Sequence, residues 1–72
     1  MDKELVGKVL VLLHEKNHTV YELAKNLNVD DEIEILKVIV YLEVQNQITL
    51  KGFKTVYRED GGCIHLEIYG IY

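Results

Sequence analysis

Apolar side chains recur at helical spacing in three separate segments of this chain. Between residues 5 and 13 they form one broad stripe, and between residues 20 and 27 they recur at i, i+3, i+4 and i+7. Between residues 33 and 44 they cover most of the surface of a third segment. We therefore predict three helices, over residues 2–16, 19–28 and 31–45.

Polar residues mark the ends of the second and third predicted helices. Thr19 followed three residues later by Glu22 is a capping box, in which each side chain accepts from a backbone amide near the other residue. Asn28 tolerates the left-handed conformation with which helices often end. Asp30 or Asp31 can then cap the next helix. The pattern predicts two helices joined by a tight turn.

Beyond residue 47 the apolar spacing changes to the period of a β-strand. Residues 48–50 are predicted to form a short strand, and Lys51 and Gly52 are predicted to turn the chain. Residues 53–58 and 63–69 then form a hairpin, whose connection contains two glycines that allow positive φ. The predicted order is three helices followed by three strands, which is an α+β fold.

The apolar surface of the third predicted helix is wider than one contact needs. Ile35, Val38, Ile39 and Leu42 fall on one face at 100° per residue, and a second, adjoining face is apolar as well. That second face consists of Ile33, Leu36, Val40 and Val44. A helix that touches two other helices and a sheet needs such width, so we expect the core to account for most of it. The remainder would be a dimer contact.

Length and composition limit what the chain can be. A chain of 72 residues buries enough surface for one domain, which we expect to span residues 1–72. The apolar run over 5–13 is too short to cross a bilayer and no cleavage site comes after it, so we expect a cytoplasmic protein without membrane contact.

The candidate chemistry is sparse. One cysteine, Cys63, excludes an internal disulfide and is interpreted as a small buried thiol. His14 and His18 are interpreted as surface residues, because no complete set of metal ligands accompanies them. No phosphate loop, activated nucleophile or catalytic carboxylate pair is found, so we expect neither an enzyme nor a cofactor or metal site.

The helix-turn-helix segment and the residues after it resemble a known family. Members of the winged helix-turn-helix family show a pattern close to ELAxxLxV, then a recognition helix, a leucine-glutamate pair and a turn into a hairpin called the wing. The corresponding positions here hold Glu22-Leu23-Ala24, Leu27, Val29, Leu42-Glu43 and Ile48. The resemblance covers nearly the whole chain. It departs in a third helix that is one residue longer and in Asn46, where the family usually has glycine.

This resemblance implies a small DNA-binding transcriptional regulator. Its third helix would enter the major groove of double-stranded DNA, and a homodimer would read two half-sites, since one small module makes few contacts. We expect the second helix and the wing to hold phosphates, because residues 44–58 contain bases and no acid. The candidate contacts are Lys37, Tyr41 and Gln45 in the groove, and Lys25, Asn26, Lys51, Lys54 and Arg58 on phosphates.

The charges also support a different function. The net charge is −4, and four acids, Asp30, Asp31, Glu32 and Glu34, stand at the start of the third helix, where they repel phosphate. The alternative is a winged-helix protein-interaction module that does not bind DNA, in which the acidic third helix docks a basic partner or the apolar C-terminal strand, residues 64–72, docks a partner chain. A simpler interpretation is that these acids cap the helix and complement its dipole, and that the lysines of the hairpin discourage edge-to-edge association.

Overall fold

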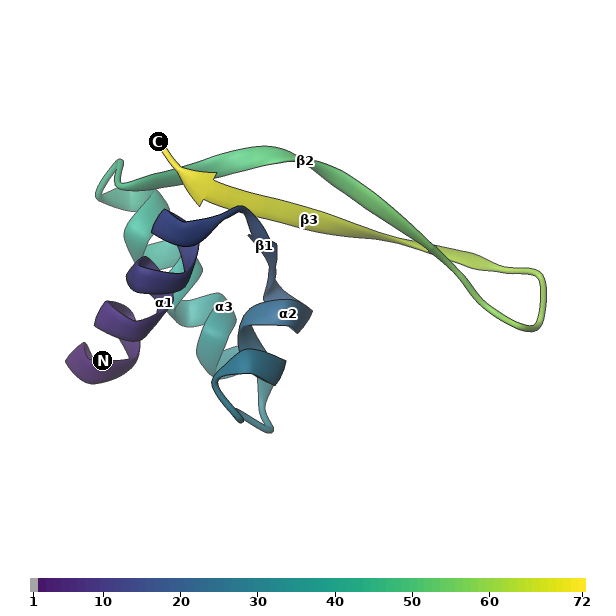
Figure 1. The fold of residues 1–72 in the computed structure, drawn as a ribbon, viewed down its shortest axis with the longest axis horizontal. Coiled ribbons are helices and arrows are strands. Elements are labelled where there is room, and N and C mark those ends of the chain that lie inside the picture. Colours follow the sequence, from purple (N-terminus) through teal and green to yellow (C-terminus); the bar gives the residue numbers. More distant parts are fainter. Residues whose placement is uncertain (1) are drawn as a thin grey trace.

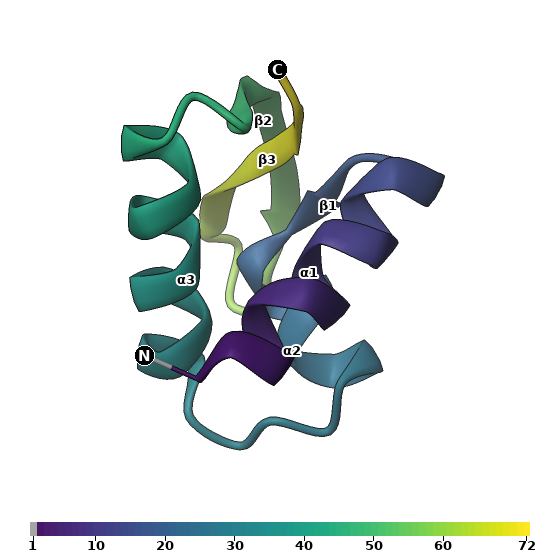
Figure 2. The ribbon, with the colours of Figure 1, turned by 90° about the vertical axis from the view of Figure 1, so that its left-hand side faces the viewer.

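Three helices pack at one end of a three-stranded antiparallel sheet (Figure 1). The computed structural model describes residues 2–72 and confirms the α+β class. Along the chain the elements are α1 (Lys3–Glu15), β1 (His18–Thr19), α2 (Val20–Asn26), α3 (Glu32–Val44), β2 (Ile48–Tyr57) and β3 (Cys63–Ile71). In the view along β2 and β3 (Figure 2), α1 and α3 stand side by side with the strands behind them.

The helix starts depend on local hydrogen bonds. The Thr19 hydroxyl accepts from the Glu22 amide at 3.1 Å, and the Glu22 carboxylate accepts from the Thr19 amide at 2.9 Å, which confirms the capping box. Of the two acids proposed to cap α3, Asp31 is the one that does so, because its carboxylate accepts from the Ile33 amide at 2.9 Å. Asp2 caps α1 in the same way.

The helix ends depend on backbone conformation. Asn28 and Asn46 have φ angles of 56° and 58°, so both occupy the left-handed region that glycine usually fills. The next amides along the chain close the helices: Val29 N donates to Ala24 O at 2.9 Å, and Gln47 N donates to Leu42 O at 3.0 Å. The predicted turn after α2 is therefore confirmed, and α3 ends at Val44, next to its predicted end at residue 45.

The capping box makes stability depend on pH in a specific way. The hydrogen bond from the Thr19 amide lowers the pKa of Glu22 below its ordinary value of 4.5, with the nearby charge of Lys54 acting in the same direction. A carboxylate whose pKa is lower in the folded chain stabilises the fold at pH values above its pKa in the unfolded chain. This stabilisation is lost as the pH falls through the pKa of the folded chain. We expect the stability advantage of the native chain over Glu22→Gln to be larger at pH 7 than at pH 3.

Urea unfolding of both proteins at the two pH values measures this difference. The variant Glu15→Gln removes one carboxylate from an exposed position at the end of α1 and serves as the control. If the native chain is more stable than Glu22→Gln by the same amount at both pH values, the prediction is wrong.

The sheet differs from the prediction in two places. β2 is one strand from Ile48 to Tyr57, and the turn predicted at Lys51 and Gly52 is wrong; a β-bulge shifts the register between Leu50 and Gly52 instead. The third strand is β1, in the segment interpreted as a connection. It pairs His18 with Tyr69 and Thr19 with Ile68, and places β3 at the centre of the sheet. Two residues are too few to show a strand period.

The core lies between the helices and the base of the sheet. The inner face of α3 is buried as predicted, and it packs with residues from α1, α2, β2 and β3. The buried apolar residues are Val9, Leu13, Leu23, Ala24, Ile35, Val38, Ile39, Leu42, Ile48 and Tyr69.

Two residues with candidate chemistry lie elsewhere than predicted. His18 is buried, with its Nδ1 2.8 Å from the carbonyl oxygen of Lys16, so its interpretation as a surface residue is wrong. Cys63 is exposed at the start of β3, so its interpretation as a buried thiol is also wrong. Both errors arise from the strand pairing, which draws residues 18–19 into the sheet and carries the start of β3 away from the helices.

β2 and β3 pair along their whole length and form a hairpin over residues 48–71, here called the long hairpin, which extends as a two-stranded arm beyond the helices (Figure 1). It makes the molecule elongated, with extents of 39 × 24 × 20 Å. The helices cover only the end of the hairpin that lies near the C-terminus.

Candidate functional site

The side of α3 that faces away from the core is apolar. Val40 is 57% exposed and Val44 is 72% exposed, and Ile33 lies on the same side, seven residues before Val40. Leu36 and Tyr41 flank this line and are exposed as well. These five residues form the outer face of α3. The expectation that the core accounts for most of the apolar width of α3 is therefore wrong.

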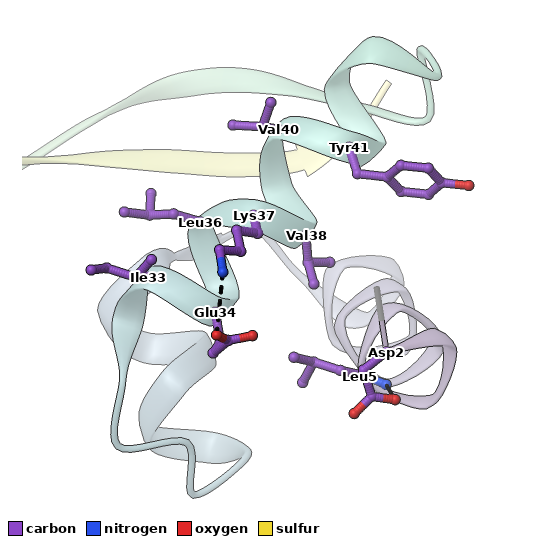
Figure 3. Close-up of a pocket in the computed structure, with 9 residues that line it drawn as sticks. All are labelled: Asp2, Leu5, Ile33, Glu34, Leu36, Lys37, Val38, Val40 and Tyr41. Carbon is purple, nitrogen blue, oxygen red and sulfur yellow. Dashed lines mark hydrogen bonds and ion pairs between the residues drawn. The ribbon is translucent and has the colours of Figure 1, made fainter.

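A groove of about 740 Å³ separates part of this face from the start of α1 (Figure 3). Asp2 and Leu5 line one side, and α3 lines the other from Ile33 to Tyr41. Ile33, Leu36 and Val40 point away from α1, towards the side of the long hairpin. The polar groups of the groove already have partners, since Glu34 pairs with Lys37 at 3.5 Å and the Asp2 carboxylate accepts from the first amides of α1.

A second groove, of about 530 Å³, lies between α2, α3 and the long hairpin. Leu36 of α3 lines this groove too, together with Val56, Ile64 and Leu66 of the hairpin. Because Leu36 belongs to both grooves, one apolar surface runs from α1 across α3 to the hairpin. The sequence signalled the α3 part through its second apolar face, but it did not indicate that Val56, Ile64 and Leu66 of the hairpin would line a groove with it.

The three residues predicted to contact the major groove of DNA lie at or near α3. Lys37 and Tyr41 both line the groove beside α1, and Gln45 caps the end of α3. Lys37 lies beside the apolar residues of the outer face of α3, and its ammonium is in an ion pair with Glu34. The structure thus brings two of these residues together, among Ile33, Leu36 and Val40.

The phosphate candidates are distributed over two elements. Lys25 and Asn26 are exposed at the end of α2. Lys51 and Lys54 lie in β2 and Arg58 directly follows its last residue, so Lys51 and Arg58 are about 23 Å apart at the rise of a strand. Arg58 pairs with Asp60 at 2.8 Å. The hydrogen bond from the Gly62 amide, and to a smaller extent this pair, lower the pKa of Asp60.

The four acids extend along the start of α3. Asp31 caps the helix and Glu32 and Glu34 lie in its first turn, where the helix dipole stabilises negative charge. All four, including Asp30, are exposed. The last turn of α3 contains no base, so no positive charge balances them at the other end of the helix.

A partly buried polar contact joins two side chains of β3. The Tyr69 hydroxyl donates to the Glu67 carboxylate, and burial together with this contact raises the pKa of Tyr69. Tyr69 therefore remains a protonated donor at neutral pH.

Neither a cluster of metal ligands nor a membrane-crossing helix is found in the described part of the chain. Among residues 2–72, no three His, Cys, Asp or Glu side chains are grouped so that they could hold a metal ion. No helix between residues 2 and 72 combines the length and the apolar character needed to cross a bilayer.

Comparison of the chain with models of known protein families, with curated proteins and with solved structures finds no match.

Proposed function

We propose that this chain is a protein-interaction module of the winged-helix type, which docks a protein chain through the outer face of α3 and does not bind DNA with it. The order α1, α2, α3 and hairpin, with the tight turn at Asn28, supports the winged-helix layout. The single observation that carries the docking function is the exposed apolar surface of Ile33, Val40 and Val44.

This surface is chemically unsuited to DNA. A helix in the major groove needs hydrogen-bonding side chains that reach base edges and positive charge near phosphates. Here the residues that would point into the groove are aliphatic, and the first turn adds carboxylates that phosphate repels. Exposed apolar patches with a polar rim are instead typical of protein-binding surfaces.

The bases that would bind phosphate are partly neutralised. Lys37 and Arg58 are in ion pairs with acids. Lys25 on α2 and Lys51 and Lys54 on β2 remain from the predicted set. Three lysines on two elements give a weak electrostatic attraction that salt screens readily.

We expect a labelled random duplex to show no binding tighter than about 100 μM at about 50 mM salt, which is weaker than ordinary non-specific association. Fluorescence anisotropy of the duplex, titrated with protein at about 50 mM and about 200 mM salt, measures this. Micromolar affinity that falls steeply between the two salt concentrations would overturn the proposal.

The second candidate function is DNA binding through the long hairpin. It is favoured by β2, which carries Lys51 and Lys54 and no acid. In that case the double variant Lys51→Ala, Lys54→Ala would lower both duplex affinity and its salt dependence in the same titration. If the native chain binds and the double variant binds equally well, the hairpin is not the DNA site.

A further inference from the structure

We infer that the partner of α3 is the long hairpin of a second copy of this chain, in a two-fold dimer where each hairpin lies on the outer face of the other copy's α3. The inference rests on the proposed docking function and names its partner. Three observations support it: the uncovered hairpin, the shape of the molecule and the distribution of charge.

The long hairpin exposes large apolar side chains. Phe53 is 63% exposed and Tyr57 is 81% exposed, although both are in a strand. The accessible surface of the chain is 5099 Å², whereas a monomer of its mass typically exposes about 4,600 Å². Two-stranded hairpins are marginally stable in water unless something packs on them, so a partner on this arm would stabilise it.

The shape allows two copies to interlock. The hairpin and the helices form an elbow (Figure 1), and the groove inside the elbow is lined by Leu36 from α3 and by Val56 and Ile64 from the hairpin. A second copy, turned by 180°, can place its hairpin along α3 of the first copy while the hairpin of the first copy lies along α3 of the second. A two-fold axis makes the two contacts identical, so the assembly closes as a dimer.

The charges favour the hairpin over α3 itself as the partner surface. The first turn of α3 holds Glu32 and Glu34 beside Asp31, whereas β2 carries two bases and no acid. If α3 packed antiparallel on α3 of a second copy, the acids of each first turn would lie beside the last turn of the other helix, which contains no base. Among the acids of the hairpin, Asp60 pairs with Arg58, Glu67 accepts from Tyr69, and Glu59 lies in the connection beyond β2.

The repeated contact halves the area that each single contact has to bury. Stable interfaces bury about 1,200 Å² or more in total, which two contacts reach with about 300 Å² on each of their four surfaces. Each copy contributes two of these surfaces, one on its α3 and one on its hairpin. Five exposed residues on α3 and the residues on the Lys54 face of the hairpin, namely Val56, Ile64 and Leu66, contribute to this area.

A charge exchange between two variants tests this arrangement. One variant carries Glu32→Lys and Glu34→Lys, and the other carries Lys51→Glu and Lys54→Glu. Each variant alone places like charges at both contacts and should raise the dimer dissociation constant at least tenfold. In an equimolar mixture every contact again joins opposite charges, so the mixture should form heterodimers.

Sedimentation equilibrium measures the outcome, with the native chain expected at twice its mass of 8.4 kDa. Circular dichroism checks folding, because lysine in the first turn of α3 opposes the helix dipole. If that variant does not fold, Glu32→Gln with Glu34→Gln replaces it, and this pair should weaken the dimer several-fold.

Three results would overturn the dimer. In the first, each variant alone is as dimeric as the native chain. In the second, both variants are monomeric alone and their mixture stays monomeric. A native chain that is monomeric at about 500 μM, where even weak pairs associate, would also overturn it. If the native chain is monomeric and does not bind the duplex, only the dimer is wrong and the docking function remains. If the chain binds the duplex through α3, the docking function is wrong as well.

Discussion

Leu42→Ala is expected to lower the free energy of unfolding by about 3 kcal/mol, because it removes a buried side chain and leaves a cavity. Leu42 is fully buried on the inner face of α3. A domain of this size is stable by about 4–11 kcal/mol in total, so the substitution removes a large part of the stability. The melting temperature should fall by about 12–24 °C.

Urea unfolding and a thermal scan measure this effect. Val44→Ala, on the exposed side of the same helix, is the matched control and should change the free energy by less than about 0.5 kcal/mol. Both measurements are made at low protein concentration, where association does not contribute to the measured stability. Equal losses for the two variants would show that the inner face of α3 is not the core.

Val40→Asp is expected to weaken association at least about 100-fold, because the interface would then bury an unpaired carboxylate in both copies. The same substitution should leave the stability of the isolated chain nearly unchanged, since Val40 is exposed on α3. Loss of association without loss of stability is the signature of a docking surface.

Sedimentation velocity and urea unfolding together test this separation. Val11→Asp is the matched control, because Val11 is exposed to a similar degree in the middle of α1 and lies outside the outer face of α3. We expect Val11→Asp to associate as the native chain does. If both variants associate equally, or if Val40→Asp remains as dimeric as the native chain, the outer face of α3 is not the contact.

The helix boundaries were predictable because short-range interactions fix them. Thr19 and Glu22 satisfy each other within one turn, and Asn28 ends α2 through its own backbone conformation. The inner face of α3 was predictable too, since the spacing of Ile35 and Leu42 already places them together. None of these features depends on a residue far away in the chain.

The features that sequence did not reveal depend on distant pairing. β1 exists because β3 returns beside residues 18–19, and no local pattern announces that contact. The bulge after Leu50 replaces a turn because Lys51 and Gly52 fit either geometry, and only pairing with β3 distinguishes them. The candidate site was half predicted: the second apolar face of α3 was seen, but only the packing of the other elements decides that it is exposed.

Thr19 belongs to two elements, and this has a consequence for the order of folding. Its side chain begins α2, while its backbone pairs with Ile68, about 50 residues further along the chain. A seven-residue helix is too short to persist alone in water, and closing so long a loop is slow compared with helix formation. α2 and the sheet should therefore consolidate in one late step, after α1 and α3 have begun to form.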